Sequence, residues 1–120
     1  MLAFIFFLSL FANHLFAQDL FFSEYSEGSS NNKYLEIFNP TSQTINLLNY
    51  GIAGVRNSQD TPGQHEVWID FPSESYIPSR GTYLLSNGSA DDNILNNADF
   101  ILDGFSVLSF NGDDALALVI

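Results

Sequence analysis

Short segments of alternating hydrophobic and polar residues follow one another from residue 20 onward, and polar turns separate them. Within 34–38, for example, Leu35 and Ile37 share one face of an extended strand, and the other three residues share the opposite face. No stretch after residue 17 keeps the 3.6-residue period of a helix, and we expect at most one helical turn, within 90–97. The pattern predicts strands at 20–25, 34–38, 45–55, 66–71, 82–86, 105–110 and 115–120, and therefore an all-β antiparallel sandwich or barrel.

The last two predicted strands are expected to form a hairpin, because Asn111-Gly112-Asp113-Asp114 lies between two alternating runs. Gly51 and Gly54 predict a bend or bulge inside 45–55. Alternation and apolar runs also give an expected core, which consists of Leu20, Phe22, Leu35, Ile37, Leu47, Ile52, Val67, Ile69, Phe71, Leu85, Leu108, Leu116 and Leu118.

The first segment, residues 1–17, has a different character, since it is apolar apart from Ser9, Asn13 and His14. Its apolar run has the length of the hydrophobic centre of a secretory signal and is shorter than the roughly 20 residues that cross a bilayer. Ala17 is a small residue suited to the position before cleavage. We therefore predict a signal peptide at 1–17, a mature domain at 18–120 without a membrane span, and a secreted, cell-surface or periplasmic location. The alternative is a buried strand or helix.

Composition narrows the possible functions. The chain has 3 Lys and Arg against 14 Asp and Glu, a formal net charge of −11, and no Cys. An acidic surface repels phosphate backbones, so direct nucleic-acid binding is not expected. The absence of Cys excludes disulfides, thiolate nucleophiles and Cys-ligated zinc. A hydrophobic fraction of 46% excludes a simply disordered chain.

Catalytic residues are scarce in the predicted mature part. It contains one His, His65, and no Gly-x-Ser-x-Gly elbow for a nucleophilic serine. We expect His65 to be an ordinary residue at the edge of a loop. The sequence therefore predicts that the chain is not an enzyme.

Carboxylates in predicted loops are the remaining candidates for metal chemistry, because Ca²⁺ binds where several oxygens converge. The candidate ligands are Asp91, Asp92, Asp103, Asp113 and Asp114. An EF-hand interpretation of 99–110 fails, since Ile101 and Phe110 occupy positions that must ligate. The competing interpretation, which we favour, is that the acidic side chains at 113 and 114 hydrogen-bond their own turn. No cofactor is expected, with Ca²⁺ as the one candidate.

Other polar and aromatic residues have expected roles of their own. Glu36 lies among apolar residues in a strand, and we expect a structural role, such as accepting loop N–H groups. Asn39 precedes Pro40 and is expected to form a turn. Trp68, Tyr34 and Phe38 are candidates for an exposed aromatic patch that binds a protein or a glycan, and the alternative is that a second sheet covers them.

Several segments together resemble the lamin-tail domain, an immunoglobulin-like β-sandwich. They are LFFSEY at 20–25, KYLEIFNP at 33–40, INLLNYGI at 45–52, VWIDFP at 67–72, YIPSRGTYLL at 76–85 and FNGDDALAL at 110–118. The match spans about 19–120, and its residue sequences resemble those of the secreted bacterial branch of the family.

The resemblance implies a noncatalytic interaction or adhesion module. In the bacterial branch such modules accompany secreted enzymes, so the alternative is an N-terminal accessory domain of a longer secreted nuclease or phosphoesterase. The family pattern also expects a further strand after residue 120. The uncharged segment 115–120 would otherwise form an open sheet edge, which predicts that the sandwich lacks its last strand or strands.

Overall fold

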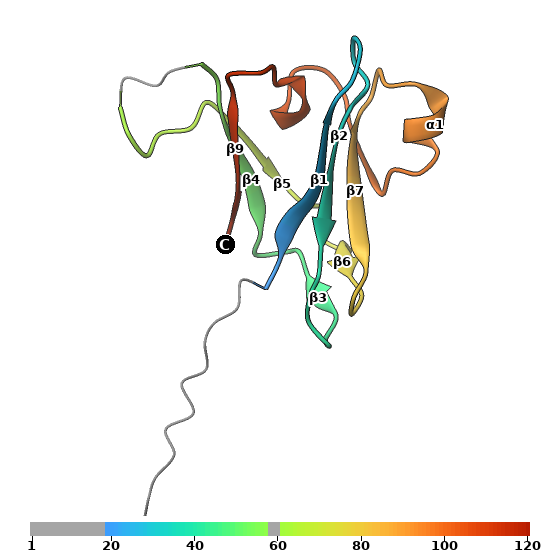
Figure 1. Ribbon diagram of the computed structural model, residues 1–120. Coiled ribbons are helices and arrows are strands. Elements are labelled where there is room, and N and C mark those ends of the chain that lie inside the picture. Colours follow the sequence, from blue (N-terminus) through green and yellow to red (C-terminus); the bar gives the residue numbers. More distant parts are fainter. Residues whose placement is uncertain (1–18, 58–60) are drawn as a thin grey trace, which may run out of the picture.

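The computed structural model describes residues 19–57 and 61–120, so the predicted signal peptide at 1–17 lies outside the described residues. Within the described ranges the chain forms strands with short connections (Figure 1). The strands are β1 (Phe21–Glu27), β2 (Lys33–Phe38), β3 (Ile45–Asn46), β4 (Gly51–Val55), β5 (Val67–Asp70), β6 (Tyr76–Ile77), β7 (Thr82–Asn87), β8 (Phe100–Leu102) and β9 (Ala115–Val119). A helical turn, α1 (Asp92–Leu95), and a 3₁₀ turn, η1 (Val107–Ser109), complete these elements.

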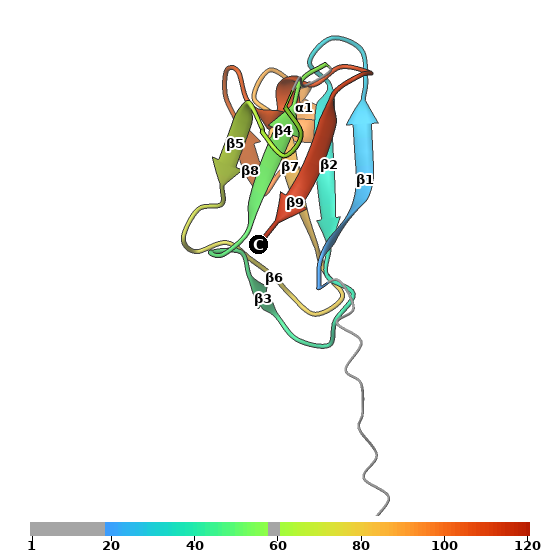
Figure 2. The same cartoon turned by 90° about the vertical axis from the view of Figure 1, so that its left-hand side faces the viewer.

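The strands form two facing sheets and one small sheet. The first sheet has the order β1-β2-β7-β8, the second has the order β5-β4-β9, and β3 pairs with β6. Figures 1 and 2 show the two larger sheets packed face to face, with the β3–β6 pair at the lower end of the sandwich in both views. The predicted all-β sandwich is confirmed.

The core lies between the two sheets and is built from inward-facing residues of the strands together with residues beside the strands and in η1. Its buried members are Leu20, Leu35, Ile37, Leu47, Ile52, Val67, Phe71, Ile77, Tyr83, Leu85, Val107, Leu108 and Phe110. The other predicted core residues, Phe22, Ile69, Leu116 and Leu118, are partly buried and pack against this cluster. The predicted core is therefore confirmed, and Ile77, Tyr83, Val107 and Phe110 are additions to it. Each such aliphatic or aromatic side chain contributes about 1.5–3 kcal/mol through burial.

The predicted hairpin between 105–110 and 115–120 is wrong. Residues Val107–Ser109 form the 3₁₀ turn η1, and β9 pairs with β4 of the second sheet instead. The segment Asn111–Asp114 does form a turn, closed by a bond from the Asp114 N–H to the Asn111 carbonyl at 2.9 Å. Gly112 does not adopt a positive φ, which a two-residue type I′ hairpin requires at both central positions. The turn therefore leads the chain from η1 into β9.

Two further differences concern strand boundaries and direction. The single strand predicted at 45–55 is two strands, β3 and β4, which belong to different sheets. β8, in a stretch where the pattern predicts no strand, pairs with β7, and this pair is parallel while the other pairs are antiparallel. The connection between β7 and β8 contains α1, which confirms the predicted helical turn within 90–97. In the described ranges no helix has the length and apolar character to cross a membrane.

Candidate binding surface

The outer face of the first sheet carries three rows of side chains across β1, β2 and β7. The antiparallel register places Glu24 opposite Glu36, with Leu84 beyond it on β7. A second row contains Phe21, Phe38 and Thr82, and a third contains Ser26, Tyr34 and Ser86. Because Leu35 and Ile37 point into the core, the residues at 34, 36 and 38 face away from it. Tyr34, Glu36 and Phe38 are thus brought together on one face.

A register shift between Phe22 and Glu24 in β1 sets the position of the first glutamate. Phe22 points toward the core, so strict alternation would direct Glu24 toward the core as well. The bulge at Ser23 adds one residue, and Glu24 therefore lies opposite Glu36 on the outer face. Sequence reasoning missed Glu24, since a bulge without glycine leaves no clear signal in the residue pattern.

Neutral hydroxyl groups hold both carboxylates in place. The Tyr34 hydroxyl donates to Glu24 Oε1 at 2.6 Å, and the Ser23 hydroxyl donates to Glu36 Oε1 at 2.7 Å. The bond to Glu24 raises the pKa of the Tyr34 phenol above its ordinary value, and burial and the charges of Glu24 and Glu36 add to that rise. The phenol therefore stays protonated as a donor. The partner of the Glu36 side chain is a hydroxyl, not the loop N–H groups suggested as an example.

A groove of about 240 Å³ lies over this row. It is lined by Glu24, Tyr34, Glu36, Leu84, Asn93, Ile94 and Asn97. The last three residues belong to α1 and the turn after it, which stand beside β7 in Figure 1. The groove thus combines two carboxylates and two amides with apolar groups contributed by β7 and α1.

Phe38 borders the same face. Its ring packs edge-to-face against Phe21, with the ring centroids 5.6 Å apart and an interplanar angle of 69°. Phe21 is 39% exposed, and Phe38 is partly buried. An aromatic pair therefore lies beside the acidic row on the surface of the sheet.

Trp68 belongs to a different surface, because it lies on β5 in the second sheet. It is 41% exposed, and its Nε1–H donates to Asp70 Oδ1 at 2.8 Å. Its ring lies across Gly51, where an added Cβ would come within 2.2 Å of the Trp68 ring. His65 is an exposed loop residue, and the centroid of its ring lies 5.3 Å from that of the Trp68 ring. The three aromatic candidates are therefore divided between two sheets.

Asn39 is fully buried at the end of β2 and connects three segments. Its side-chain amide donates to the carbonyls of Gln43, Ile77 and Pro78, at distances between 2.7 and 3.0 Å. Its carbonyl accepts from the N–H and the hydroxyl of Thr41. This amide thus forms the turn after β2 and also fixes the β6 end of the sandwich, which a turn-forming residue alone would not do.

The five loop aspartates are found in several separate settings. Asp91 exchanges two hydrogen bonds with Asn32, Asp92 lies in the first turn of α1, and Asp103 packs against Gly88. Asp113 is exposed, and Asp114 accepts bonds from the N–H groups of Asn57 and Asn111, both at 2.9 Å. In the ranges 19–57 and 61–120, no three or more Asp, Glu, His or Cys side chains gather in a way that would hold a metal ion.

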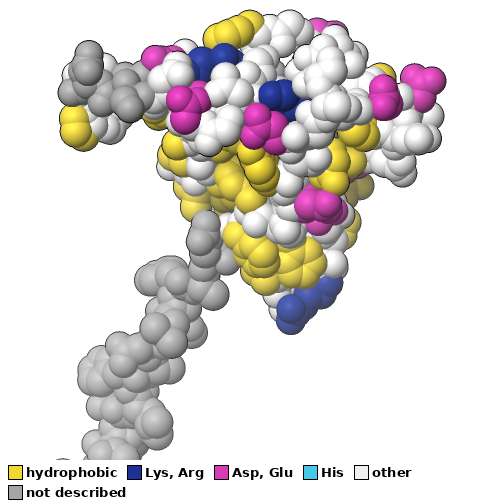
Figure 3. All heavy atoms as spheres, turned by 45° about the horizontal axis from the view of Figure 1, so that its top comes forward, with side chains coloured by type: hydrophobic (Ala, Val, Ile, Leu, Met, Phe, Trp, Pro, Cys, Tyr) yellow, Lys and Arg dark blue, Asp and Glu magenta, His cyan; other side chains and the backbone are white. Residues whose placement is uncertain are grey.

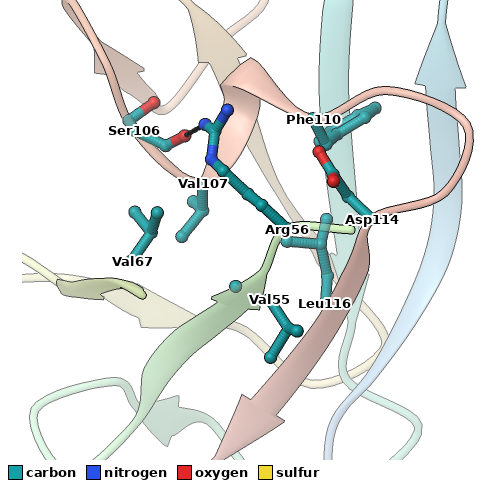
Figure 4. A pocket seen from close by; sticks show the side chains of 9 residues that line it. Val55, Arg56, Val67, Ser106, Val107, Phe110, Asp114 and Leu116 are labelled. Carbon is teal, nitrogen blue, oxygen red and sulfur yellow. Dashed lines mark hydrogen bonds between the residues drawn. The ribbon is translucent and has the colours of Figure 1, made fainter. Parts of the chain in front are cut away.

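A small cavity beneath η1 provides an example of polar groups used within the fold (Figure 4). Arg56 crosses it, donates from Nη2 to the Ser106 carbonyl at 3.2 Å, and lies with its guanidinium carbon 3.7 Å from the centre of the Phe105 ring. Asp114 lines the same cavity. The free volume is about 10 Å³, roughly the space of one water molecule, so this cavity is too small for a larger ligand.

The pKa of the Asp114 carboxyl reflects its bonds and neighbouring charges within the fold. Burial raises the pKa of its carboxyl, but the bonds from Asn57 and Asn111 and the charges of Arg56 and Lys33 outweigh that effect. The net result is a pKa below the ordinary value. Sequence reasoning placed this residue in the Asn111–Asp114 turn and did not identify its partner Asn57.

The fold places this protein in the class of small immunoglobulin-like β-sandwich domains. Its outer face carries a groove, and its described residues gather no metal cluster. A family model described as Lamin Tail Domain matches residues 17–119. The chain therefore belongs to the lamin-tail domain family, a family of noncatalytic immunoglobulin-like domains. This confirms the family that the residue pattern resembles. No curated protein matches the sequence.

Proposed function

We propose that this chain is a secreted, noncatalytic module that binds a partner through the outer face of β1 and β2. The observation that carries the proposal is the arrangement of that face. The aromatic pair Phe21–Phe38 lies beside a groove that contains Tyr34 and two glutamates. Aromatic side chains are enriched in protein interfaces, because they bury large areas and lose little conformational freedom.

Binding can be tested on arrays of glycans and of random peptides. The native protein is expected to bind a subset of one array, and Phe38→Ser is expected to lose that binding, since the variant removes half of the aromatic pair. Trp68→Ser is the matched control, because it removes an aromatic side chain from the other sheet. Equal binding by Phe38→Ser and the native protein, or no binding at all, would contradict the proposal.

The family and the scarcity of catalytic residue types in the sequence support a module without catalysis. We expect no hydrolysis of DNA or of phosphodiesters above the blank in the presence of Mg²⁺, Mn²⁺ or Ca²⁺. Turnover that a single carboxylate substitution abolishes would overturn this expectation. It would also revive the five loop aspartates as ligand candidates.

The resemblance to the secreted bacterial branch favours a second assignment, an accessory domain of a longer secreted nuclease or phosphoesterase. Both assignments require the same binding module, so they differ only in the chain downstream of it. The reading frame after residue 120 distinguishes them: a catalytic domain there supports the accessory assignment, and a stop codon supports a binder that acts alone.

Secretion rests on the apolar segment 1–17. Fused to an alkaline phosphatase that is active only after export, this segment is expected to give activity in a bacterial host. Replacing two leucines of the apolar run by arginine should abolish that activity. Activity that survives this replacement would contradict the signal assignment.

A further inference from the structure

Two like charges lie directly opposite each other in the binding surface. Glu24 and Glu36 are register partners on adjacent strands, and like charges in that arrangement destabilise a sheet. The bulge in β1 creates the pair, since regular alternation would point the first of these residues toward the core. The sheet thus holds an arrangement that works against its own stability.

The hydrogen bonds at this pair orient the two carboxylates without neutralising them. Their donors are the hydroxyls of Tyr34 and Ser23, and each reaches the carboxylate only at Oε1. Among the described residues, Oε2 of both glutamates has no hydrogen-bond partner. Two negative charges and two acceptor oxygens therefore remain available at the groove.

The cations of the chain are placed elsewhere. Lys33 forms an ion pair with Glu27 at 3.8 Å and donates to the Phe110 carbonyl, and Arg56 is engaged with Ser106 and Phe105. Arg80 lies in the turn before β7, and in the described part of the chain no ion pair reaches Glu24 or Glu36. A counter-charge for the groove must therefore come from outside these residues.

We propose that the groove receives an arginine side chain from an extended segment of a partner protein, an inference that rests on the function proposed above. A guanidinium presents several N–H donors in one plane and binds carboxylates through paired hydrogen bonds. Tyr34 lines the same groove, and an aromatic ring attracts a guanidinium that lies over it. Leu84 and Ile94 line the groove where the apolar stem of an arginine would lie.

Two other features favour this occupant. The formal net charge of −11 speeds the encounter with a basic partner. Figure 3 shows acidic side chains at scattered positions over the side of the molecule that it presents, with Lys and Arg at few places. A bound Ca²⁺ ion is less suited, because the groove brings together only two acidic side chains and the described residues gather no group of three or more Asp, Glu, His or Cys.

The test measures the affinity of the protein for a flexible, end-blocked peptide of glycine, serine and arginine at near-physiological salt. Glu24→Gln/Glu36→Gln is expected to weaken binding by about tenfold, because it removes both charged acceptors while keeping an amide oxygen for each hydroxyl donor. The matched control Glu74→Gln/Asp113→Asn removes the same charge from exposed residues outside the groove and should change affinity by less than about twofold.

Each outcome either supports or overturns the inference. Equal weakening by the two double variants would mean general attraction to an acidic surface and would overturn it. Equal affinity for the same peptide with lysine in place of arginine would overturn the choice of arginine, and Ca²⁺ binding that the glutamine variant abolishes would replace it by a metal. If the arginine peptide fails while an array ligand still depends on Phe38, this inference is wrong and the proposed function stands.

Discussion

The outer face of β1 and β2 and the region beneath η1 use polar residues in opposite ways. Under η1, Asp114 accepts two backbone bonds, and Arg56 is held by a carbonyl and an aromatic ring, although its buried Nε has no hydrogen-bond partner among the described residues. On the outer face, Glu24 and Glu36 oppose each other and are bonded only by hydroxyls. Polar groups satisfied within the fold stabilise it, whereas those that oppose one another and face solvent are available to a partner. Substitutions in the two regions should therefore affect stability and binding differently.

The largest effect is expected at Asn39, which belongs to the internally satisfied class. Asn39→Ala leaves three buried or partly buried carbonyls without their donor, so we expect a loss of about 2–4 kcal/mol in the free energy of unfolding. Denaturant unfolding measures this loss. Asn46→Ala, which removes an exposed amide with one backbone bond, is the control and should cost about 1 kcal/mol or less. A similar loss for both variants would contradict the role of the buried network.

A smaller but still clear effect is expected at Gly51, beneath the Trp68 ring. Gly51→Ala places a Cβ within the space of that ring, so the ring must move, at a cost of about 1–3 kcal/mol. Trp68 is the single tryptophan of the chain, and its fluorescence reports the movement directly. Gly112→Ala, where an added Cβ meets nothing within 4 Å, is the matched control. An unchanged emission spectrum in Gly51→Ala would show that the ring does not lie there.

Asp114 provides a pH-dependent comparison. Its folded-state pKa lies below the ordinary value, so its contribution to stability is present above the unfolded pKa of about 3.9 and is lost as pH falls through the folded pKa. Asp114→Asn should lower stability at neutral pH by less than about 1 kcal/mol, because the group is partly exposed to solvent. The difference from the native protein should shrink in acid. A difference that grows as pH falls would contradict this sign.

The smallest effect is expected on the binding surface, and it has the opposite sign. Glu24→Gln removes the like-charge repulsion and should stabilise the fold by about 0.2–1 kcal/mol at low ionic strength, an effect that added salt reduces. Thermal unfolding at two salt concentrations measures it. A loss of stability that does not depend on salt would mean that Glu24 belongs with the internally satisfied residues.

The sequence predicts the sandwich because the side-chain period of a strand identifies the buried face without knowledge of the strand's partners. That period assigns Leu35 and Ile37 to the core, and Tyr34, Glu36 and Phe38 to one common face, as the structure has them. The partner strands are harder to predict. The Asn111–Asp114 turn lies between two apolar segments, which favours a hairpin. The segment before it forms the η1 turn, however, and the segment after it pairs with β4.

Much of the binding surface depends on how strands that are distant in the sequence pair with each other. Glu24 reaches the outer face through a bulge whose sequence, Phe22-Ser23-Glu24, also fits a regular strand. Asn93 and Asn97 reach the groove because β8 returns to pair with β7 in parallel. In that return, Asp99 exchanges bonds with Leu84 through its side chain and its N–H, which an alternation pattern does not reveal.

The central claim is that a partner binds the outer face of β1 and β2 by placing an arginine in the groove there. The most direct test is an NMR titration of the isotope-labelled protein with the arginine peptide, following the amide signal of every residue. We predict that chemical-shift changes concentrate at the groove residues Glu24, Tyr34, Glu36, Leu84, Asn93 and Asn97. The signals of β5 and of Arg56 and Asp114, which line the cavity under η1, should stay in place. Shift changes spread evenly over the acidic residues, or centred on Trp68, would contradict the claim.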